Sequence, residues 1–166
     1  MNIPLDENEE IVWQNLVNAF FSYVEASGVF FKPEVDHVKL LREGFRRGDI
    51  AVALDIASSL ESSKLTELLP ELVNMSTAHG YAPRVREIIL SLPHNWLITC
   101  IKEVAEPILQ SGDDFEFRQI FQLYLEIDRT LAVKLAEKAI NGSDEYIREV
   151  GKELLEQISK IKPAPD

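Results

Sequence analysis

The chain has 166 residues, with 28 acidic and 17 basic side chains, which gives a formal net charge of −11. This length fits one domain over residues 1–166, and a hydrophobic fraction of 46% excludes wholesale disorder. The acidic balance argues against nucleic-acid binding, which needs a basic face, and no apolar run approaches the roughly 20 residues of a membrane span. The start, MNIPLDENEE, does not resemble a secretory signal, and there is one cysteine, Cys100. We therefore expect a reducing cytoplasm.

The first predicted element is a helix over about 5–27, opened by the capping-box pattern Asp6-x-x-Glu9. Apolar side chains cover most of its circumference: Ile11, Val12, Trp13, Leu16, Val17, Phe20, Phe21, Tyr23 and Val24. Such a helix is either buried on two sides or presents an apolar patch to a partner. We expect a capping helix that lies as a hydrophobic lid on the first of the following helices. The segment 29–31, before Pro33, is predicted to be extended.

Four glycines recur along the rest of the chain at nearly equal spacing. Gly48, Gly80, Gly112 and Gly142 lie 32, 32 and 30 residues apart. After the last three, the sequence follows the pattern Gly-x4-apolar-Arg-Glu/Gln-Ile/Val, whereas Leu54 replaces the arginine after the first. Self-similarity at a fixed period is typical of repeat architectures. The chain is therefore predicted to contain an internal repeat.

Each of these glycines is followed by helical spacing of apolar residues. The stripe comprises Ala53, Ile56, Ala57, Leu60; Val85, Ile88, Ile89, Leu92; Phe117, Ile120, Phe121, Tyr124; and Ile147, Val150, Gly151, Leu154. This is the i, i+3, i+4, i+7 pattern of an amphipathic helix.

A second helix fits before each glycine. These helices are predicted over about 34–47, 63–79, 94–111 and 129–141. Pro70 and Pro107 fall inside two of them and should kink or end them, because proline lacks the backbone N–H. The result is four helix pairs, and a tail follows them; the predicted bounds are 33–61, 62–92, 93–127, 128–160 and, for the tail, 161–166.

Paired helices with an acid near the turn and Val-Arg or Ile-Arg early in the second helix resemble HEAT-type repeats. The best match is NGSDEYIRE at 141–149, and the resemblance covers about 34–160. It implies an all-α fold, a short right-handed superhelix of HEAT or armadillo type, that binds other proteins on its concave surface. The units are shorter than usual, and Leu54 departs from the motif. A minority of HEAT-like folds act on DNA or assist chromophore attachment.

Candidate catalytic and metal-binding residues are few. The three histidines, His37, His79 and His94, lack metal-ligand spacing, and the position of His79 near a helix C-terminus accounts for it. Cys100 projects from a different face than His94, and we expect it to be a buried structural cysteine. Basic side chains cluster over residues 34–48, but acidic side chains lie among them, so this segment is predicted to form a solvated helix face. We expect no catalytic constellation, metal or cofactor.

The arginines of the repeated pattern carry a structural prediction. Arg86, Arg118 and Arg148 share one register, and the next position holds the prospective partners Asp55, Glu87, Gln119 and Glu149. If the second helices stack side by side, the arginine of one repeat reaches an acid of its neighbour, which suits a planar guanidinium. We expect an inter-repeat ladder; the alternative is a row of exposed specificity residues.

Acidic and anchoring residues on the outward side of the later second helices form the predicted partner surface. It comprises Glu116, Leu123, Glu126, Tyr146, Glu149 and Glu153. We expect a non-enzymatic protein-binding adaptor or regulatory module whose partner is a protein with a basic surface. The alternatives are a small acidic immunity or inhibitor protein and an accessory enzyme subunit, similar to HEAT-like bilin lyase subunits. A solvated, charged cap would explain the same acids without a partner.

Overall fold

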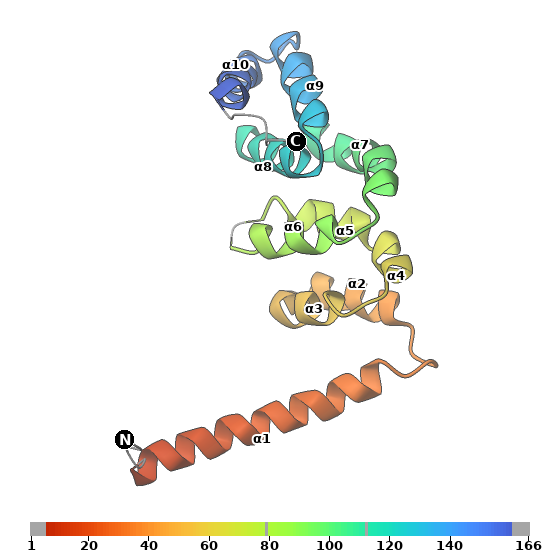
Figure 1. Cartoon of the computed structure of the whole chain (residues 1–166), viewed down its shortest axis with the longest axis vertical. Helices are drawn as coiled ribbons and strands as arrows, with labels where there is room; N and C mark the ends of the chain where they lie inside the picture. Colours follow the sequence, from red (N-terminus) through yellow and green to blue (C-terminus); the bar gives the residue numbers. More distant parts are fainter. Residues whose placement is uncertain (1–5, 79, 112, 161–166) are drawn as a thin grey trace.

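The computed structural model describes residues 6–78, 80–111 and 113–160. Within these ranges the chain is all-α, as predicted, with ten helices and no strand (Figure 1). The helices are α1 (Glu7–Phe30), α2 (His37–Arg47), α3 (Ile50–Ala57), α4 (Ser62–Glu67), α5 (Leu69–Met75), α6 (Ala82–Leu90), α7 (His94–Ser111), α8 (Asp114–Ile127), α9 (Arg129–Ile140) and α10 (Glu145–Lys160). None of the described helices is both long and apolar enough to cross a membrane.

Helices α2 to α10 form a stack of antiparallel pairs. Within the pairs, α2 contacts α3, α5 contacts α6, α7 contacts α8 and α9 contacts α10, and neighbouring pairs contact one another through α5–α7 and α8–α9. Their second helices also contact one another in succession, from α3 through α6 and α8 to α10, and lie along one side of the stack (left in Figure 1). This succession brings the repeated arginines of α6 and α8 next to the following second helix.

The two internal prolines have different effects. The helix predicted over 63–79 is divided at Leu68 into α4 and α5, with Pro70 in the first turn of α5. A proline is tolerated there because its missing N–H would have no partner within the helix. Pro107, in contrast, lies inside α7, which continues to Ser111. Of the two predicted outcomes, Pro107 does not end its helix, and a kink at this position stays a prediction.

Two of the four periodic glycines adopt a backbone conformation that favours glycine. Gly48 ends α2 at a φ of 87°, and Gly80 precedes α6 at a φ of 88°. A Cβ makes such positive φ values unfavourable, so these turns account for two of the glycines. Gly142 follows the end of α9, where its N–H donates to the Ala139 carbonyl (3.0 Å). Gly112, like His79 and the predicted tail at 161–166, lies outside the described residues.

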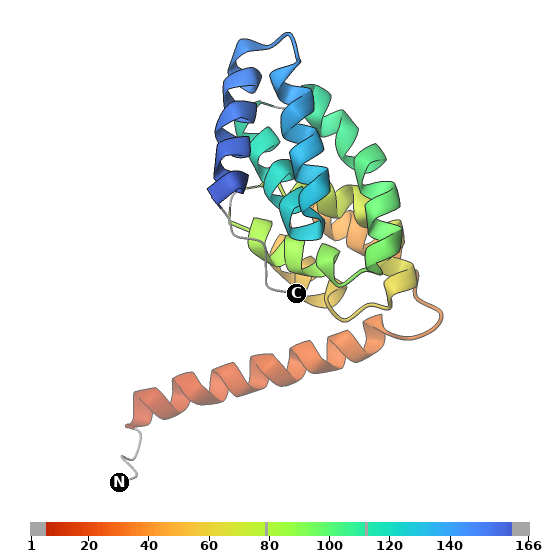
Figure 2. The same ribbon diagram turned by 45° about the horizontal axis from the view of Figure 1, so that its top comes forward.

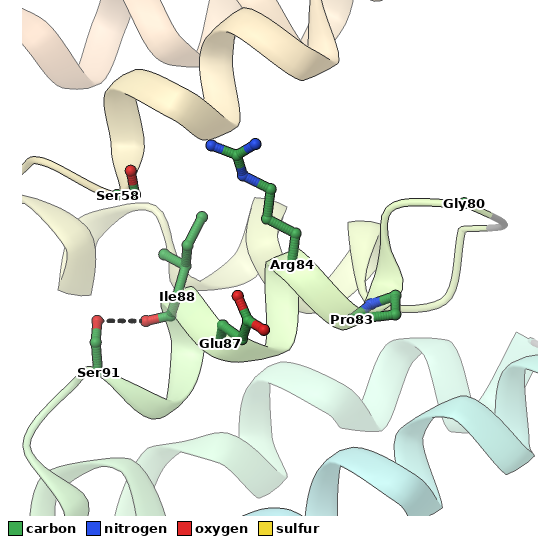
Figure 3. Close-up of a pocket in the computed structure, with 7 residues that line it drawn as sticks. All are labelled: Ser58, Gly80, Pro83, Arg84, Glu87, Ile88 and Ser91. Atoms are coloured by element: carbon green, nitrogen blue, oxygen red, sulfur yellow. Dashed lines mark hydrogen bonds between the residues drawn. The ribbon is translucent and has the colours of Figure 1, made fainter. Parts of the chain in front are cut away.

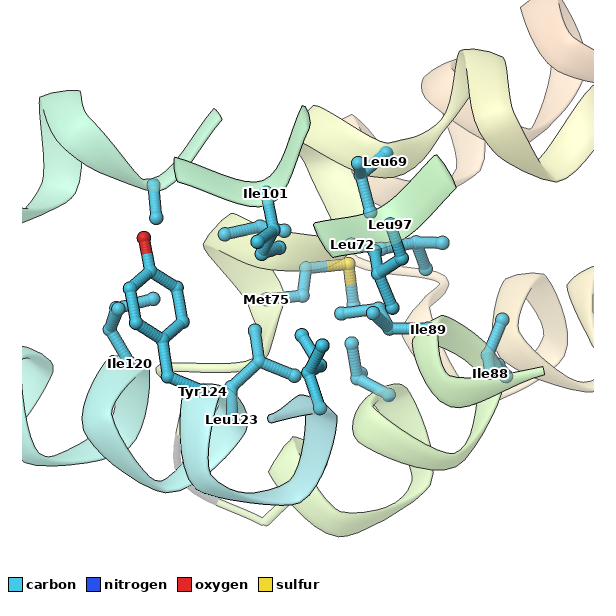
Figure 4. Close-up of a cluster of buried hydrophobic side chains, with 14 of the residues drawn as sticks. Leu69, Leu72, Met75, Ile88, Ile89, Leu97, Ile101, Ile120, Leu123 and Tyr124 are labelled. Atoms are coloured by element: carbon cyan, nitrogen blue, oxygen red, sulfur yellow. The ribbon is translucent and has the colours of Figure 1, made fainter. Parts of the chain in front are cut away.

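The predicted apolar stripe forms the core, as expected. All of its members are buried except Leu60 and Ile147, which are half-buried. Figure 4 shows Leu72, Ile89, Ile101 and other side chains from α5 to α8 meeting in one cluster. Each large side chain buried there contributes about 1.5–3 kcal/mol of transfer free energy. Tyr124 belongs to the same cluster, and burial raises the pKa of its phenol to about 12.

The N-terminal helix is not a lid. α1 has no buried residue and extends away from the stack, to which it is joined at its C-terminal end (Figures 1 and 2). Its capping box forms as predicted: the Asp6 carboxylate accepts the Glu9 N–H (2.9 Å), and the Glu9 carboxylate accepts the Asp6 N–H (2.8 Å). The helix also includes Phe30, which was expected to be extended. Proline restricts only the residue directly before it, so the helix can continue to within three residues of Pro33.

Candidate functional site

The described residues contain no cluster of three or more histidine, cysteine, aspartate or glutamate side chains that could hold a metal ion. Cys100 is half-buried, and its thiol donates a hydrogen bond to the Trp96 carbonyl (3.3 Å). Burial raises the pKa of this thiol, which favours the protonated form and lowers its nucleophilicity. These contacts agree with a structural cysteine.

A groove of about 610 Å³ lies beside α6 and is lined in part by Gly80, Pro83, Arg84 and Ser91 (Figure 3). Two of its polar side chains, Arg84 and Ser91, are engaged within the protein. The Arg84 guanidinium points to α3 and pairs with Asp55 (2.7 Å), and the Ser91 hydroxyl donates to the Ile88 carbonyl (2.6 Å). The pair with Asp55 joins α6 to α3, whereas the Ser91 bond is local to the end of α6. We assign this groove a structural role.

Asp55 also joins α1 to the stack. The Tyr23 hydroxyl donates a hydrogen bond to the Asp55 carboxylate, which Arg84 contacts from α6. The hydrogen bond from Tyr23 and then the one from Arg84 lower the pKa of Asp55. Because between 38% and 49% of each of the three is exposed, water screens the cluster and it contributes little to stability. It therefore attaches α1 only weakly.

Two of the predicted ladder arginines reach the next second helix. Arg86 on α6 contacts Gln119 (3.2 Å), as the register predicts, and also pairs with Glu126 (3.2 Å). Arg118 on α8 pairs with Glu153 of α10 (2.7 Å), not with the predicted Glu149. Glu153 lies four residues, or about one helical turn, beyond Glu149. The sequence pattern identified the arginines, but the relative shift of the two helices selects the partner.

Arg148 and the two predicted acids, Glu87 and Glu149, do not take the predicted ladder partners. Arg148 donates to the carbonyls of Gly142 (3.3 Å) and Ser143 (3.0 Å), in the loop before its own helix, because α10 is the last described helix. Glu87 is exposed, and the preceding second helix has Leu54 at the position from which an arginine would reach it. The prediction of a ladder role is wrong for Arg148. Arg84, two residues before Arg86, makes the missed connection to α3.

Arg42 is exposed, as predicted for this basic helix face, but it also bridges to two other helices. Its guanidinium pairs with Glu71 (2.6 Å) and donates to the Glu67 carbonyl (2.7 Å), so it joins α2 to the chain at α4 and α5. Arg46 and Arg47 instead pair with Glu43 on their own helix at 2.7 Å. Arg42 and Glu71 are 29 residues apart in the chain, so local sequence spacing does not predict this contact.

We expect Arg86→Lys to lower the free energy of unfolding by about 1–2 kcal/mol, because lysine cannot contact Gln119 and Glu126 together. The Arg86 side chain is only 14% exposed, so water replaces these contacts poorly. Arg47→Lys, at an exposed pair within one helix, is the control and should change little. Urea midpoints compare the two variants, and equal effects would contradict the inter-helix role of Arg86.

Three of the predicted partner-binding residues have structural roles. Leu123 is completely buried, which corrects its assignment as a surface anchor. Its position on α8 faces inward because α7 and α9 pack against the same helix. Glu116 forms a capping box with Asp113, and Glu126 pairs with Arg86. A helix that is covered on several sides leaves few positions for a partner.

The remaining three residues line one surface between α8 and α10. Tyr146, Glu149 and Glu153 form, with Asp114, Arg118, Val150, Lys152 and Glu156, the α8–α10 groove, which has a volume of about 480 Å³. Tyr146 is 82% exposed in the first turn of α10. Four carboxylates and two cations make the groove acidic on balance.

Two carboxylates of the groove, Glu149 and Glu153, have a lowered pKa and are therefore ionised at neutral pH. A hydrogen bond from Lys152 lowers the pKa of Glu149, and one from Arg118 lowers the pKa of Glu153. Glu156 pairs with Lys160 (2.8 Å) on the solvent side. These are exposed pairs of the kind that exchange readily with other cations. The groove therefore offers a charged surface that a basic partner can contact.

No family model, curated protein or solved structure matches the chain. The likeness to HEAT-type repeats therefore remains an inference from the repeated glycine and arginine pattern. Any function has to be inferred from the surfaces that the helices present.

Proposed function

We propose that the protein is a non-enzymatic protein-binding module, a short HEAT-like superhelix whose α8–α10 groove receives a basic segment of another protein. The observation that carries this proposal is Tyr146, an aromatic side chain 82% exposed beside an acidic groove. Tyrosine is enriched among the residues that dominate binding energy at protein interfaces. A large exposed ring with no place in the core is well suited to be such an anchor.

The charge around Tyr146 selects the kind of partner. Glu149 and Glu153 lie within the same groove, and the chain as a whole carries a net charge of −11. Such a field accelerates the approach of a basic partner. A lysine or arginine of that partner can then replace Lys152 at Glu149, or stack on the Tyr146 ring through a cation–π contact. A segment combining basic and apolar side chains fits this surface best.

Selection from a random peptide library displayed on phage tests the proposal without knowledge of the natural partner. We expect the selected peptides to be enriched in lysine and arginine, and their affinity to fall as salt is raised. The triple variant Tyr146→Ser, Glu149→Gln, Glu156→Gln should lose at least about 10-fold in affinity, which corresponds to about 1.4 kcal/mol.

The control is the pair Glu103→Gln, Glu137→Gln, which neutralises two exposed acids on α7 and α9, away from the groove. It should keep the affinity of the original chain. Peptides without an excess of positive charge, or equal binding by the triple variant and the control, would overturn the assignment to the groove.

A further inference from the structure

α1 exposes an unusual amount of apolar surface. Its exposed large apolar residues are Ile11, Val12, Trp13, Leu16, Phe20, Phe21, Tyr23, Val24 and Val29. Trp13 is 55% exposed and Phe21 is 65% exposed, although both belong to residue types that normally lie in cores and interfaces. A contiguous apolar patch of this kind marks an interaction site.

Most of these side chains lie on one face of the helix. Trp13, Leu16, Val17, Phe20 and Val24 follow the i, i+3, i+4 spacing, and Val12 and Phe21 flank them on either side. The opposite side carries Gln14, Asn15, Asn18, Ser22 and Glu25. Ile11 and Val29 lie among these polar residues, so apolar side chains are concentrated on one side of α1 but not confined to it. This larger apolar side meets no other part of the described chain closely enough to be buried.

The charges of α1 narrow the choice of partner. Glu7, Glu9 and Glu10 lie in its first turn, Glu25 lies near its end, and the helix contains no lysine or arginine. These acids disfavour an anionic membrane surface, to which interfacial helices bind through basic residues. The stretch from 11 to 24 is uncharged. An uncharged apolar face binds best to another uncharged apolar face. The α1 helix of a second copy presents such a face.

We propose that two copies of the chain associate through antiparallel pairing of their α1 helices. In this arrangement the acidic first turns lie at opposite ends, whereas parallel pairing would bring six carboxylates together. The stacks are attached at the C-terminal ends of α1 (Figure 2), so antiparallel pairing also places them at opposite ends of the helix pair. If the two helices cross with the two-fold axis of the dimer between Asn18 and Ala19, Trp13 of one copy lies opposite Val24 of the other.

The available area is sufficient for such a dimer. Six exposed side chains of the apolar face, Val12, Trp13, Leu16, Phe20, Phe21 and Val24, each offer on the order of 100 Å². Pairing two helices would then bury roughly 1,200 Å², at the lower end of the range for specific interfaces. The predicted dimer is therefore concentration-dependent. It does not involve the α8–α10 groove, so either proposal can fail without the other.

Sedimentation velocity of the full chain between about 1 and 100 μM tests the dimer. We expect the mass to rise from that of the 18.9 kDa chain toward twice this value. Leu16→Glu with Phe20→Glu, which places charge on the apolar face, should raise the dissociation constant at least about 100-fold. The matched control, Asn18→Glu with Ser22→Glu, adds the same charges at the same spacing on the polar side and should still dimerise. Both variants should keep the thermal midpoint of the stack.

Cross-linking tests the orientation. In a Cys100→Ser background, Trp13→Cys chains mixed with Val24→Cys chains should form a mixed disulfide, and neither chain alone should cross-link efficiently. Cross-linking of each chain with itself would show parallel pairing and overturn the proposed arrangement.

Three other results would overturn the dimer itself. The first is a monomer throughout the concentration range. The second is a dimer that survives the Leu16→Glu, Phe20→Glu change, which would assign the interface to another surface. The third is a monomer whose α1 binds phosphatidylcholine vesicles, detected as a blue shift of Trp13 fluorescence in a Trp96→Phe background, which would assign the face to a lipid surface.

Discussion

Phe121→Ala is expected to lower the free energy of unfolding by about 3–5 kcal/mol. The Phe121 ring is 3% exposed in the core of α8, so truncation removes its transfer free energy and leaves a cavity that the neighbouring helices fill only in part. A domain is stabilised by about 5–15 kcal/mol in total, so this is a large share. Differential scanning calorimetry should show the midpoint lowered by about 6–20 °C.

Tyr146→Ala is the matched control, because it also removes an aromatic ring from a second helix. Its ring is exposed, so the free energy of unfolding should change by no more than about 0.5 kcal/mol. A midpoint for Phe121→Ala that is no lower than that of Tyr146→Ala would show that α8 is not packed as the structure indicates.

Gly151→Ala is expected to destabilise the chain by about 1–3 kcal/mol, although alanine is the better helix former. A Cβ at Gly151 would lie 2.9 Å from the Ala136 carbonyl oxygen and 3.0 Å from the Ala139 Cβ, both on α9. The closer contact is with backbone, so relief requires α9 and α10 to move apart. These two helices share the most extensive contact in the stack.

Gly44→Ala is expected to have the opposite effect on the free energy of unfolding. Gly44 also lies inside a helix, α2, but its Cβ would meet only the Ala53 Cβ, at an ordinary 3.5 Å. The helix propensity of alanine should therefore stabilise this variant by about 0.5–1 kcal/mol. Urea denaturation of both variants gives the comparison, and a stabilised Gly151→Ala would mean that α9 and α10 do not approach this closely.

The two proposals together describe a bivalent molecule. The α8–α10 groove lies at the end of the stack away from α1 (Figure 1), so pairing through α1 would leave both grooves open. Two grooves in one dimer would raise the apparent affinity for a partner that carries two basic segments. Loss of the dimer would remove this gain and leave the affinity of a single groove unchanged.

The sequence by itself determined the all-α class and the apolar stripe that each second helix buries. The spacing of Ile88, Ile120 and Val150 after their glycines predicts their burial. Apolar residues that recur with a period of 3.6 lie on one side of a helix, and that side can be buried against a neighbouring helix. Gly48 and Gly80 marked turns because their backbone conformations favour glycine. Both signals are local, so a single sequence contains them.

Only the tertiary structure decided which helices meet and which residues remain accessible. The sequence predicts Leu123 as a surface anchor, but Leu123 is buried, because α7 and α9 cover a side of α8 that its own spacing cannot identify. Arg118 pairs with Glu153 because the relative shift of α8 and α10 is set by packing along both helices. α1 has the apolar composition of a buried helix but is exposed. Composition indicates that an apolar face needs a partner, but it does not indicate whether that partner lies in the same chain.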